Sequence, residues 1–280
     1  MSQAEKFHLA CVMGDPIMHS RSPALHNFWM KQHGLEGAYV PVHVPLRKLE
    51  AALRALPALG FAGCNLTIPL KERALEIVDD ADAIAKKIGA ISCVTVRPDG
   101  GLFGTNNDCY GFTENLIEAF PDWKADAGPV TIIGAGGASR AVVFALAERG
   151  AQEIRLVNRT HERAQRLAAS AGGMVRTLRW EERHAALEGA ALLVNTTSQG
   201  MSKQPPLDLS LAALPKTALV CDVIYIPGET PLLADARKRG NRVVNGLGML
   251  LHQGRPAWRS WFGIDPKVTP ELRKTIEATL

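Results

Sequence analysis

The stretch that decides the fold reads Val130-Thr-Ile-Ile-Gly-Ala-Gly-Gly-Ala-Ser-Arg140. Four β-branched residues lead into a glycine cluster, and helix-forming residues from Ala141 to Arg149 follow before Gly150. This order predicts a strand, a tight turn and a helix. Glycine lets the backbone turn sharply and lets phosphates come close, and the N–H groups at a helix start attract negative charge. The stretch therefore predicts a nucleotide-binding turn, with a purely structural turn as the alternative.

The glycine spacing refines this prediction. Dinucleotide-binding turns follow Gly-x-Gly-x-x-Gly, and here Ser139 occupies the third glycine position, where a small residue still permits close helix–strand packing. The expected cofactor-binding residues of the turn are Gly134, Ala135, Gly136, Gly137 and Ala138.

The next expected strand, Glu153–Val157, ends in Asn158-Arg159-Thr160, and Arg163 follows. An NAD-preferring site places an acidic residue here for the ribose 2′-hydroxyl. The acid is missing, and arginines pair well with a 2′-phosphate. The pattern predicts NADP as the cofactor, with two solvated arginines at the start of a helix as the alternative.

Length and composition exclude several classes of protein. The chain has 280 residues, 46% of them hydrophobic and 21% charged, which is typical of a globular protein with two domains. A net charge of +4 without a basic block suits small anionic ligands and does not indicate nucleic acid. Five cysteines without a Cys-x-x-Cys pair make a metal site or disulfide framework unexpected. Residues 1–6 lack an apolar signal core and no apolar run is long enough for a membrane span, so we expect a cytoplasmic protein.

The first third of the chain alternates strand and helix patterns, which predicts a small α/β sheet. The expected strands are Phe7–Met13, Ala38–Val44, a short strand from Phe61, and Gly89–Val96. The expected helices are Pro23 to about Lys31, Leu46–Leu56 and Ala74–Lys87.

Polar residues gather where these strands are expected to end. Ser20 and Ser22 precede Pro23, and they either cap the helix or form a carboxylate cradle with its N-terminus. Asn65 and Thr67 follow an apolar strand, the place where α/β sheets bind ligands.

Two ionisable residues, Lys71 and Asp108, each have a functional and a structural interpretation. Lys71 is either part of the same site or an ordinary exposed lysine. Asp108, in the polar stretch Gly104–Phe112, is either functional or the cap of a helix that begins near Gly111.

Three ordered motifs identify a family. Gly14-x-Pro-Ile-x-His-Ser-x-Ser-Pro-x-x-His-Asn27, Asn65-x-Thr-x-Pro-x-Lys71 and Gly104-x-Asn-x-Asp-x-x-Gly-Phe112 closely resemble the shikimate dehydrogenase family over nearly the whole chain. The resemblance implies NADPH-dependent, reversible reduction of 3-dehydroshikimate to shikimate. It also implies a substrate domain of residues 1–110 completed by 246–280, a doubly wound, parallel NADP-binding (Rossmann) domain of residues 111–245, and a ligand cleft between them.

The resemblance also implies roles for single residues. Lys71 would be the acid/base, or the cation that stabilises the developing alkoxide, with Asp108 as its partner. Ser20 and Ser22 would bind the substrate carboxylate. The remaining substrate contacts would be Asn65, Thr67, Asp108, Gln253, Tyr225 and Ser92. Thr196, in the turn after the strand that begins at Ala191, and Gly246 would add to the cofactor site. A plain packing role is the alternative for Tyr225, and Trp258, Trp261 and Phe262 are expected to pack in the segment that returns to the first domain.

Two positions depart from the family pattern. Ser92 stands where the family has an asparagine that contacts substrate hydroxyls, and Asn107 replaces the threonine before the aspartate. Because a serine hydroxyl cannot offer an amide's donors, quinate, an amino analogue or another cyclic polyhydroxy acid is the alternative substrate. A non-catalytic ligand sensor is a further alternative, which the intact Lys71 and Asp108 oppose. We expect a monomer or homodimer.

Overall fold

The computed structural model describes residues 7–280 and divides into two compact units. Unit 1 combines the chain up to Asn107 with Gln253–Thr279, and unit 2 holds Asp108–His252. The sequence-based boundaries at 110 and 246 therefore differ from these by several residues. The prediction about residues 1–6 lies outside the described range. No helix of the described residues is long and apolar enough to cross a membrane.

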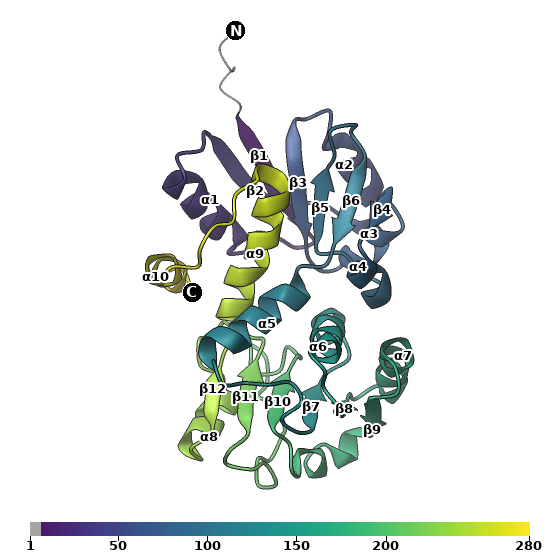
Figure 1. Ribbon diagram of the computed structural model, residues 1–280, viewed down its shortest axis with the longest axis vertical. Coiled ribbons are helices and arrows are strands. Elements are labelled where there is room, and N and C mark those ends of the chain that lie inside the picture. The colour runs from purple at the N-terminus through teal and green to yellow at the C-terminus, as the bar shows by residue number, and fades with distance from the viewer. Residues whose placement is uncertain (1–6) are drawn as a thin grey trace. The chain divides into compact units, whose positions relative to one another are not determined.

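Unit 1 contains a mixed six-stranded sheet (Figure 1). In spatial order its strands are β2 (Gly37–His43), β1 (His8–Gly14), β3 (Phe61–Leu66), β5 (Cys93–Val96), β6 (Leu102–Thr105) and β4 (Asp80–Ala81). Strand β1 is parallel to β2 and β3, whereas β5 is antiparallel to β3 and β6. The end of β3 therefore pairs with the start of β5, Asn65 opposite Cys93.

The helices of unit 1 are mostly short. They are α1 (Ser22–Gln32), the 3-10 turn Leu46–Lys48 with α2 (Leu49–Ala55), α3 (Lys71–Leu75), α4 (Ala83–Ile88) and α10 (Pro270–Glu277). Helix α9 (Leu247–Phe262) begins in the residues of unit 2 and ends in those of unit 1. Thr269 caps α10, since its hydroxyl accepts from the N–H of Leu272 at 3.2 Å.

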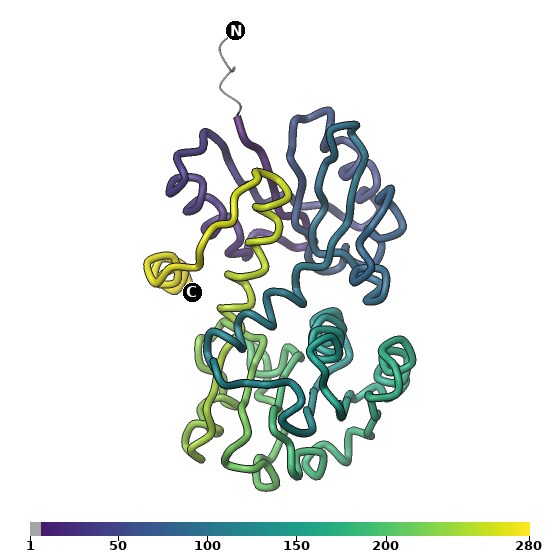
Figure 2. Tube along the Cα trace, in the orientation of Figure 1, coloured from purple at the N-terminus to yellow at the C-terminus, as the bar shows by residue number. Residues whose placement is uncertain are grey.

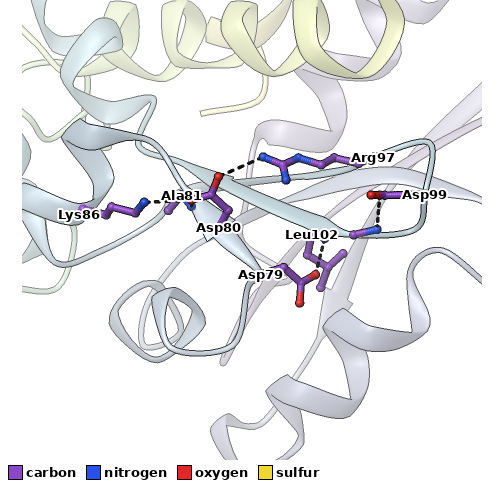
Figure 3. A network of polar contacts seen from close by, with 8 residues as sticks. Asp79, Asp80, Ala81, Lys86, Arg97, Asp99 and Leu102 are labelled. Carbon is purple, nitrogen blue, oxygen red and sulfur yellow. Dashed lines mark hydrogen bonds and ion pairs between the residues drawn. The ribbon is translucent and has the colours of Figure 1, made fainter.

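The predicted helix over Ala74–Lys87 is wrong, because β4 interrupts it. The carboxylate of Asp79 accepts from the N–H of Leu102 at 2.7 Å, and the N–H of Asp79 donates to the Leu102 carbonyl at 3.0 Å. Asp80 pairs with Lys86 and Arg97 (Figure 3). These contacts lower the pKa of Asp80 to about 2, with the Lys86 bond the largest cause. Pairing with β6 thus overrides the local helix pattern.

Alternating residues of β1 face two separate apolar clusters. Cys11 and Met13 pack in one cluster, which α2 and α3 help to form, and Ala10 and Val12 pack in the other. The second cluster includes Ala257 and Trp261 of α9, with Phe262 packed against it. Trp258 is fully buried, so the expected packing roles of Trp258, Trp261 and Phe262 are confirmed.

Unit 2 is a doubly wound parallel sheet, as predicted. Its strands, in spatial order, are β12 (Arg242–Val244), β11 (Leu219–Asp222), β10 (Leu192–Asn195), β7 (Val130–Ile133), β8 (Ile154–Val157) and β9 (Val175–Leu178). The helices are α5 (Asp108–Ala119), α6 (Gly137–Glu148), α7 (His161–Ala171) and α8 (Pro231–Lys238), with 3-10 turns at Trp180–Glu182 and Ala185–Leu187. The strand order reverses beside β7, and Figure 2 lets the reader follow the chain through that reversal.

Candidate active site

The glycine turn after β7 is tightly packed at its first glycine and open at the next two. Gly134 has φ +114°, and a Cβ there would lie 2.5 Å from the Thr196 hydroxyl oxygen, so only glycine fits. A Cβ at Gly136 or Gly137 would meet no atom within 4 Å. Helix α6 starts at Gly137 without a side-chain cap. The open space and the uncapped N–H groups therefore suit an anionic ligand.

Ser139, at the third glycine position, contributes a bond that the sequence did not indicate. Its hydroxyl is fully buried and donates to the Gly134 carbonyl at 2.7 Å. The serine therefore closes the turn, besides being small enough for the helix to pack. Ala135 and Ala138 flank the open glycines and are partly exposed.

The tip of β8 carries arginines without carboxylate partners. Arg159, Thr160 and Arg163 are exposed, and neither arginine belongs to an ion pair of the described residues. The Asn158 side chain donates to the Thr160 carbonyl at 2.8 Å and so fixes the turn. Helix α7 begins just after Thr160 without a side-chain cap. These features fit a 2′-phosphate.

Beside the glycine turn that follows β7, the ends of β10 and β11 share a network of polar side chains that the sequence did not indicate. The Thr196 hydroxyl donates to the Ile133 carbonyl at 2.8 Å. The Asp222 carboxylate accepts from the Asn195 amide at 3.1 Å and from the Thr230 hydroxyl at 2.7 Å. Burial raises the pKa of Asp222 to about 6. An aspartate at the end of an otherwise apolar, buried strand was the available signal.

In unit 1, Ser20 and Ser22 lie at the start of α1. The N-cap of α1 is Arg21, without a side-chain cap bond, so the alternative of a serine cap is wrong. The Ser20 oxygen accepts from the N–H of Ser22 at 3.2 Å. Ser22 is buried and Ser20 partly exposed.

Asn65 is held at both ends of its amide. Its carbonyl oxygen accepts from the Tyr39 hydroxyl at 2.7 Å, and its amino group donates to the Ser92 carbonyl at 3.3 Å. Burial raises the pKa of Tyr39 well above its usual range, and a hydrogen bond with Ser22 opposes that shift. Tyr39 thus connects two predicted substrate residues, Ser22 and Asn65.

Tyr39 itself was missed, although a tyrosine in an inward-facing strand position often has a polar partner for its hydroxyl. Its ring stacks on His26 with centroids 4.0 Å apart, and the Trp258 indole donates to Nδ1 of His26 at 2.8 Å. Burial lowers the pKa of His26 to about 3, so this ring is neutral.

The two predicted acid/base residues lie in different units. Lys71 is partly buried at the start of α3, and its carbonyl accepts from the N–H of Ile91 at 3.0 Å. Thr67, also partly buried, lies in the loop between β3 and α3. Asp108 is 7% exposed and is the first residue of α5. Since α5 begins there, Asp108 does not cap a helix that starts near Gly111, and that alternative is wrong.

The two departures from the family pattern are hydrogen-bonded to each other. The Ser92 hydroxyl, 1% exposed, accepts from the N–H of Asn107 at 2.8 Å. The side-chain amide oxygen of Asn107 accepts from the Thr105 hydroxyl at 3.0 Å. The Ser92 hydroxyl therefore makes a contact inside the protein, and its role toward a substrate stays a prediction.

The remaining predicted residues are distributed over the second half of the chain. Gln253 in α9 and Tyr225 after β11 are both partly buried. At Gly246 a Cβ would lie 1.9 Å from the Val223 carbonyl oxygen, so this glycine permits close backbone packing.

Family models match both halves of the chain. The model described as the shikimate dehydrogenase substrate binding domain matches residues 12–94, and the one described as shikimate / quinate 5-dehydrogenase matches residues 118–205. The chain is 54% identical to the shikimate dehydrogenase (NADP(+)) of Paramagnetospirillum magneticum over 268 residues, which are 96% of this chain and 97% of that protein.

Solved structures agree with these matches. A shikimate 5-dehydrogenase from Thermus thermophilus, in complex with NADP(H) and shikimate, has a TM-score of 0.87 and 37% identity, with 98% of this chain and 100% of that one covered. A quinate dehydrogenase from Corynebacterium glutamicum, in complex with NAD, has a TM-score of 0.91 and 30% identity, with 97% and 99% covered. This chain therefore belongs to the shikimate dehydrogenase family.

Proposed function

We propose that this protein is an NADP-dependent shikimate dehydrogenase, which reversibly reduces 3-dehydroshikimate to shikimate. The observation that carries the proposal is the group of polar side chains at the carboxyl ends of β1 and β3, in a chain whose other unit has an open glycine turn. Sequence identities of 54% and 50% to two enzymes named shikimate dehydrogenase (NADP(+)) support the same substrate.

The cofactor site would use residues of unit 2 alone. The N–H groups at Gly136 and Gly137 would bind the pyrophosphate, and Arg159 and Arg163 the 2′-phosphate, with Asn158 shaping the turn. When bound, NADPH supplies the hydride.

The substrate site would fix which carbon faces the cofactor. Ser20 and Ser22, with the start of α1, would bind the carboxylate. Asn65, already oriented by Tyr39 and by the Ser92 carbonyl, would hold a ring hydroxyl with its remaining N–H. Thr67 and Gln253 would complete the contacts to the ring, with Tyr225 at the edge of the site. Such orientation is what a hydride transfer needs most.

The proton would pass through Lys71. Its ammonium group would donate a proton to the ketone oxygen during reduction, and the neutral amine would take the hydroxyl proton during oxidation. Asp108 would balance the charge of Lys71 and bind a neighbouring hydroxyl. Both residues match the family motif, which argues against a non-catalytic sensor.

All five cysteines are buried and free, which is compatible with a reducing cytoplasm. We propose a cytoplasmic monomer or homodimer that binds neither nucleic acid nor membrane.

A substrate panel read at the nicotinamide absorbance band tests the function. We expect oxidation of shikimate with NADP to exceed oxidation with NAD, and quinate to react more slowly than shikimate. If shikimate, quinate, their dehydro forms and the amino analogue all leave the absorbance unchanged, the proposal fails. Quinate faster than shikimate would replace the substrate and keep the reaction class.

A further inference from the structure

Two parallel strands bring a third arginine to the edge where the 2′-phosphate would bind. Val157, the last residue of β8, pairs in register with Leu178, the last residue of β9. The next residues, Asn158 and Arg179, therefore leave the sheet side by side at its carboxyl edge. Neighbouring strands lie about 4.8 Å apart, so the long Arg179 side chain starts within reach of the Asn158-Arg159-Thr160 turn.

Arg179 is available for a ligand. It is exposed, and its extended backbone (φ −72°, ψ 158°) continues the direction of β9. The carboxylate of Glu182 is engaged with the backbone N–H of Arg179, at 2.8 Å. No ion pair in the described part of the chain involves the Arg179 guanidinium.

Three guanidinium groups near this edge have no carboxylate partner and can bind an anion. Arg159, Arg163 and Arg179 are exposed and unpaired with carboxylates. The exposed acids beside them are Glu162, Glu181 and Glu182, and the Glu182 carboxylate is engaged with the backbone N–H of Arg179. Like charges brought together repel, whereas a phosphomonoester dianion can bind more than one guanidinium at once. A ribose with a 2′-phosphate has this chemistry, and the same ribose with a free hydroxyl does not.

We infer that Arg179 is a further determinant of the preference for NADP over NAD, and that it binds the 2′-phosphate from the strand beside the one that carries Arg159. The inference rests on the proposed function for the identity of the cofactor. It adds a specificity residue that the Asn158-Arg159-Thr160 motif does not contain.

Binding of adenosine 2′,5′-bisphosphate and of AMP, measured by calorimetry, tests the inference without turnover. Arg179→Gln should weaken bisphosphate binding by about threefold to tenfold and leave AMP binding unchanged. Arg179→Lys keeps the charge and loses the planar guanidinium, so its affinity for the bisphosphate should lie between those of the unmodified protein and Arg179→Gln. Arg176→Gln is the matched control, because Arg176 is an exposed arginine earlier on the same strand. It should change neither binding.

Three results would overturn the inference: unchanged bisphosphate binding in Arg179→Gln, equal weakening of both nucleotides, or an equal effect in Arg176→Gln. Failure of the proposed function looks different, because it would appear as no reduction of any dehydro acid by the unmodified protein. Bisphosphate binding and its response to Arg179 remain measurable in that case.

Discussion

At the scale of single residues, the pair Ser92 and Asn107 changes how the substrate site is understood. From the sequence, Ser92 was a shortened substrate contact and Asn107 a separate departure. In the structure one hydrogen bond joins them, and Ser92 is 1% exposed. The Ser92 hydroxyl is therefore engaged within the protein, and we propose that Asn65 holds the hydroxyl that the family's asparagine would contact.

This pairing predicts that the two positions are energetically coupled. Ser92→Asn alone should lower both stability and activity, because the larger side chain has no room at a buried site. Asn107→Thr removes the side-chain oxygen that accepts from the Thr105 hydroxyl and keeps the backbone N–H that donates to position 92, so the effect of Ser92→Asn should differ in its presence by about 0.5–3 kcal/mol. Unfolding midpoints and kcat/KM for shikimate of the four proteins measure the coupling. Strictly additive effects would contradict it.

A second residue-scale prediction concerns Lys71. Lys71→Ala should lower kcat by about 10²–10⁴-fold, because the proton to the ketone oxygen loses its donor. Shikimate affinity, measured by titration without cofactor, should change far less. Lys87→Ala is the control, since Lys87 is an exposed lysine of the same unit. Turnover that survives in Lys71→Ala would remove Lys71 from the mechanism.

At the scale of elements, local sequence patterns predicted secondary structure correctly where a turn signal, such as a glycine cluster, marks the end of an element. The glycine turn after β7, followed by α6, is an example. The pattern failed over Ala74–Lys87, because Asp79 bonds to Leu102, which lies far along the chain. Helix propensity is a local quantity and contains no information about such a partner.

The glycine turn yields a prediction that separates folding from binding. Gly134→Ala should destabilise the protein by about 1–3 kcal/mol, since its φ of +114° and the nearby Thr196 hydroxyl leave no place for a Cβ. Gly136→Ala should keep the stability, because Gly136 has φ −98° and open space around it. The added methyl group would instead occupy the proposed pyrophosphate position and weaken NADP binding.

Thermal unfolding and NADP titration of both variants check this contrast. An unstable Gly136→Ala would mean that the turn has less space than its backbone indicates. If Gly136→Ala bound NADP as tightly as the unmodified protein, the pyrophosphate would not bind at Gly136.

At the scale of the whole molecule, the two-unit organisation was predicted, but the boundaries were not. The first boundary falls at Asn107–Asp108, because α5 starts at Asp108 and not near Gly111. The second lies inside α9, between His252 and Gln253. Gly254 and Pro256 follow that boundary, but the helix continues through both, so neither residue marks the change of unit by ending an element. The packing of Trp258 and Trp261 in unit 1 could be predicted from the sequence, because a segment with several large aromatic side chains usually packs into a hydrophobic core.

The acid stability of the molecule should depend on His26, which joins that returning helix to α1. His26 is fully buried, accepts from the Trp258 indole and has its pKa lowered to about 3 by burial. In the unfolded chain a histidine titrates near 6.5. Between these values the unfolded state binds a proton that the folded state does not. His26 therefore contributes its full stability above pH 6.5, and that stability falls as the pH drops toward 3, by up to about 1.4 kcal/mol per pH unit.

The test compares urea unfolding at pH 7, 6 and 5 for the unmodified protein and for His26→Asn, whose side chain keeps an acceptor and cannot be charged. The variant should be less stable at pH 7, because it loses the ring stacked on Tyr39, but its stability should fall less steeply with acid. His33→Asn, at an exposed histidine just after α1, should keep the slope of the unmodified protein. Equal slopes in all three proteins would show that other groups govern acid unfolding, whereas a shallower slope in His26→Asn alone would assign it to the buried imidazole.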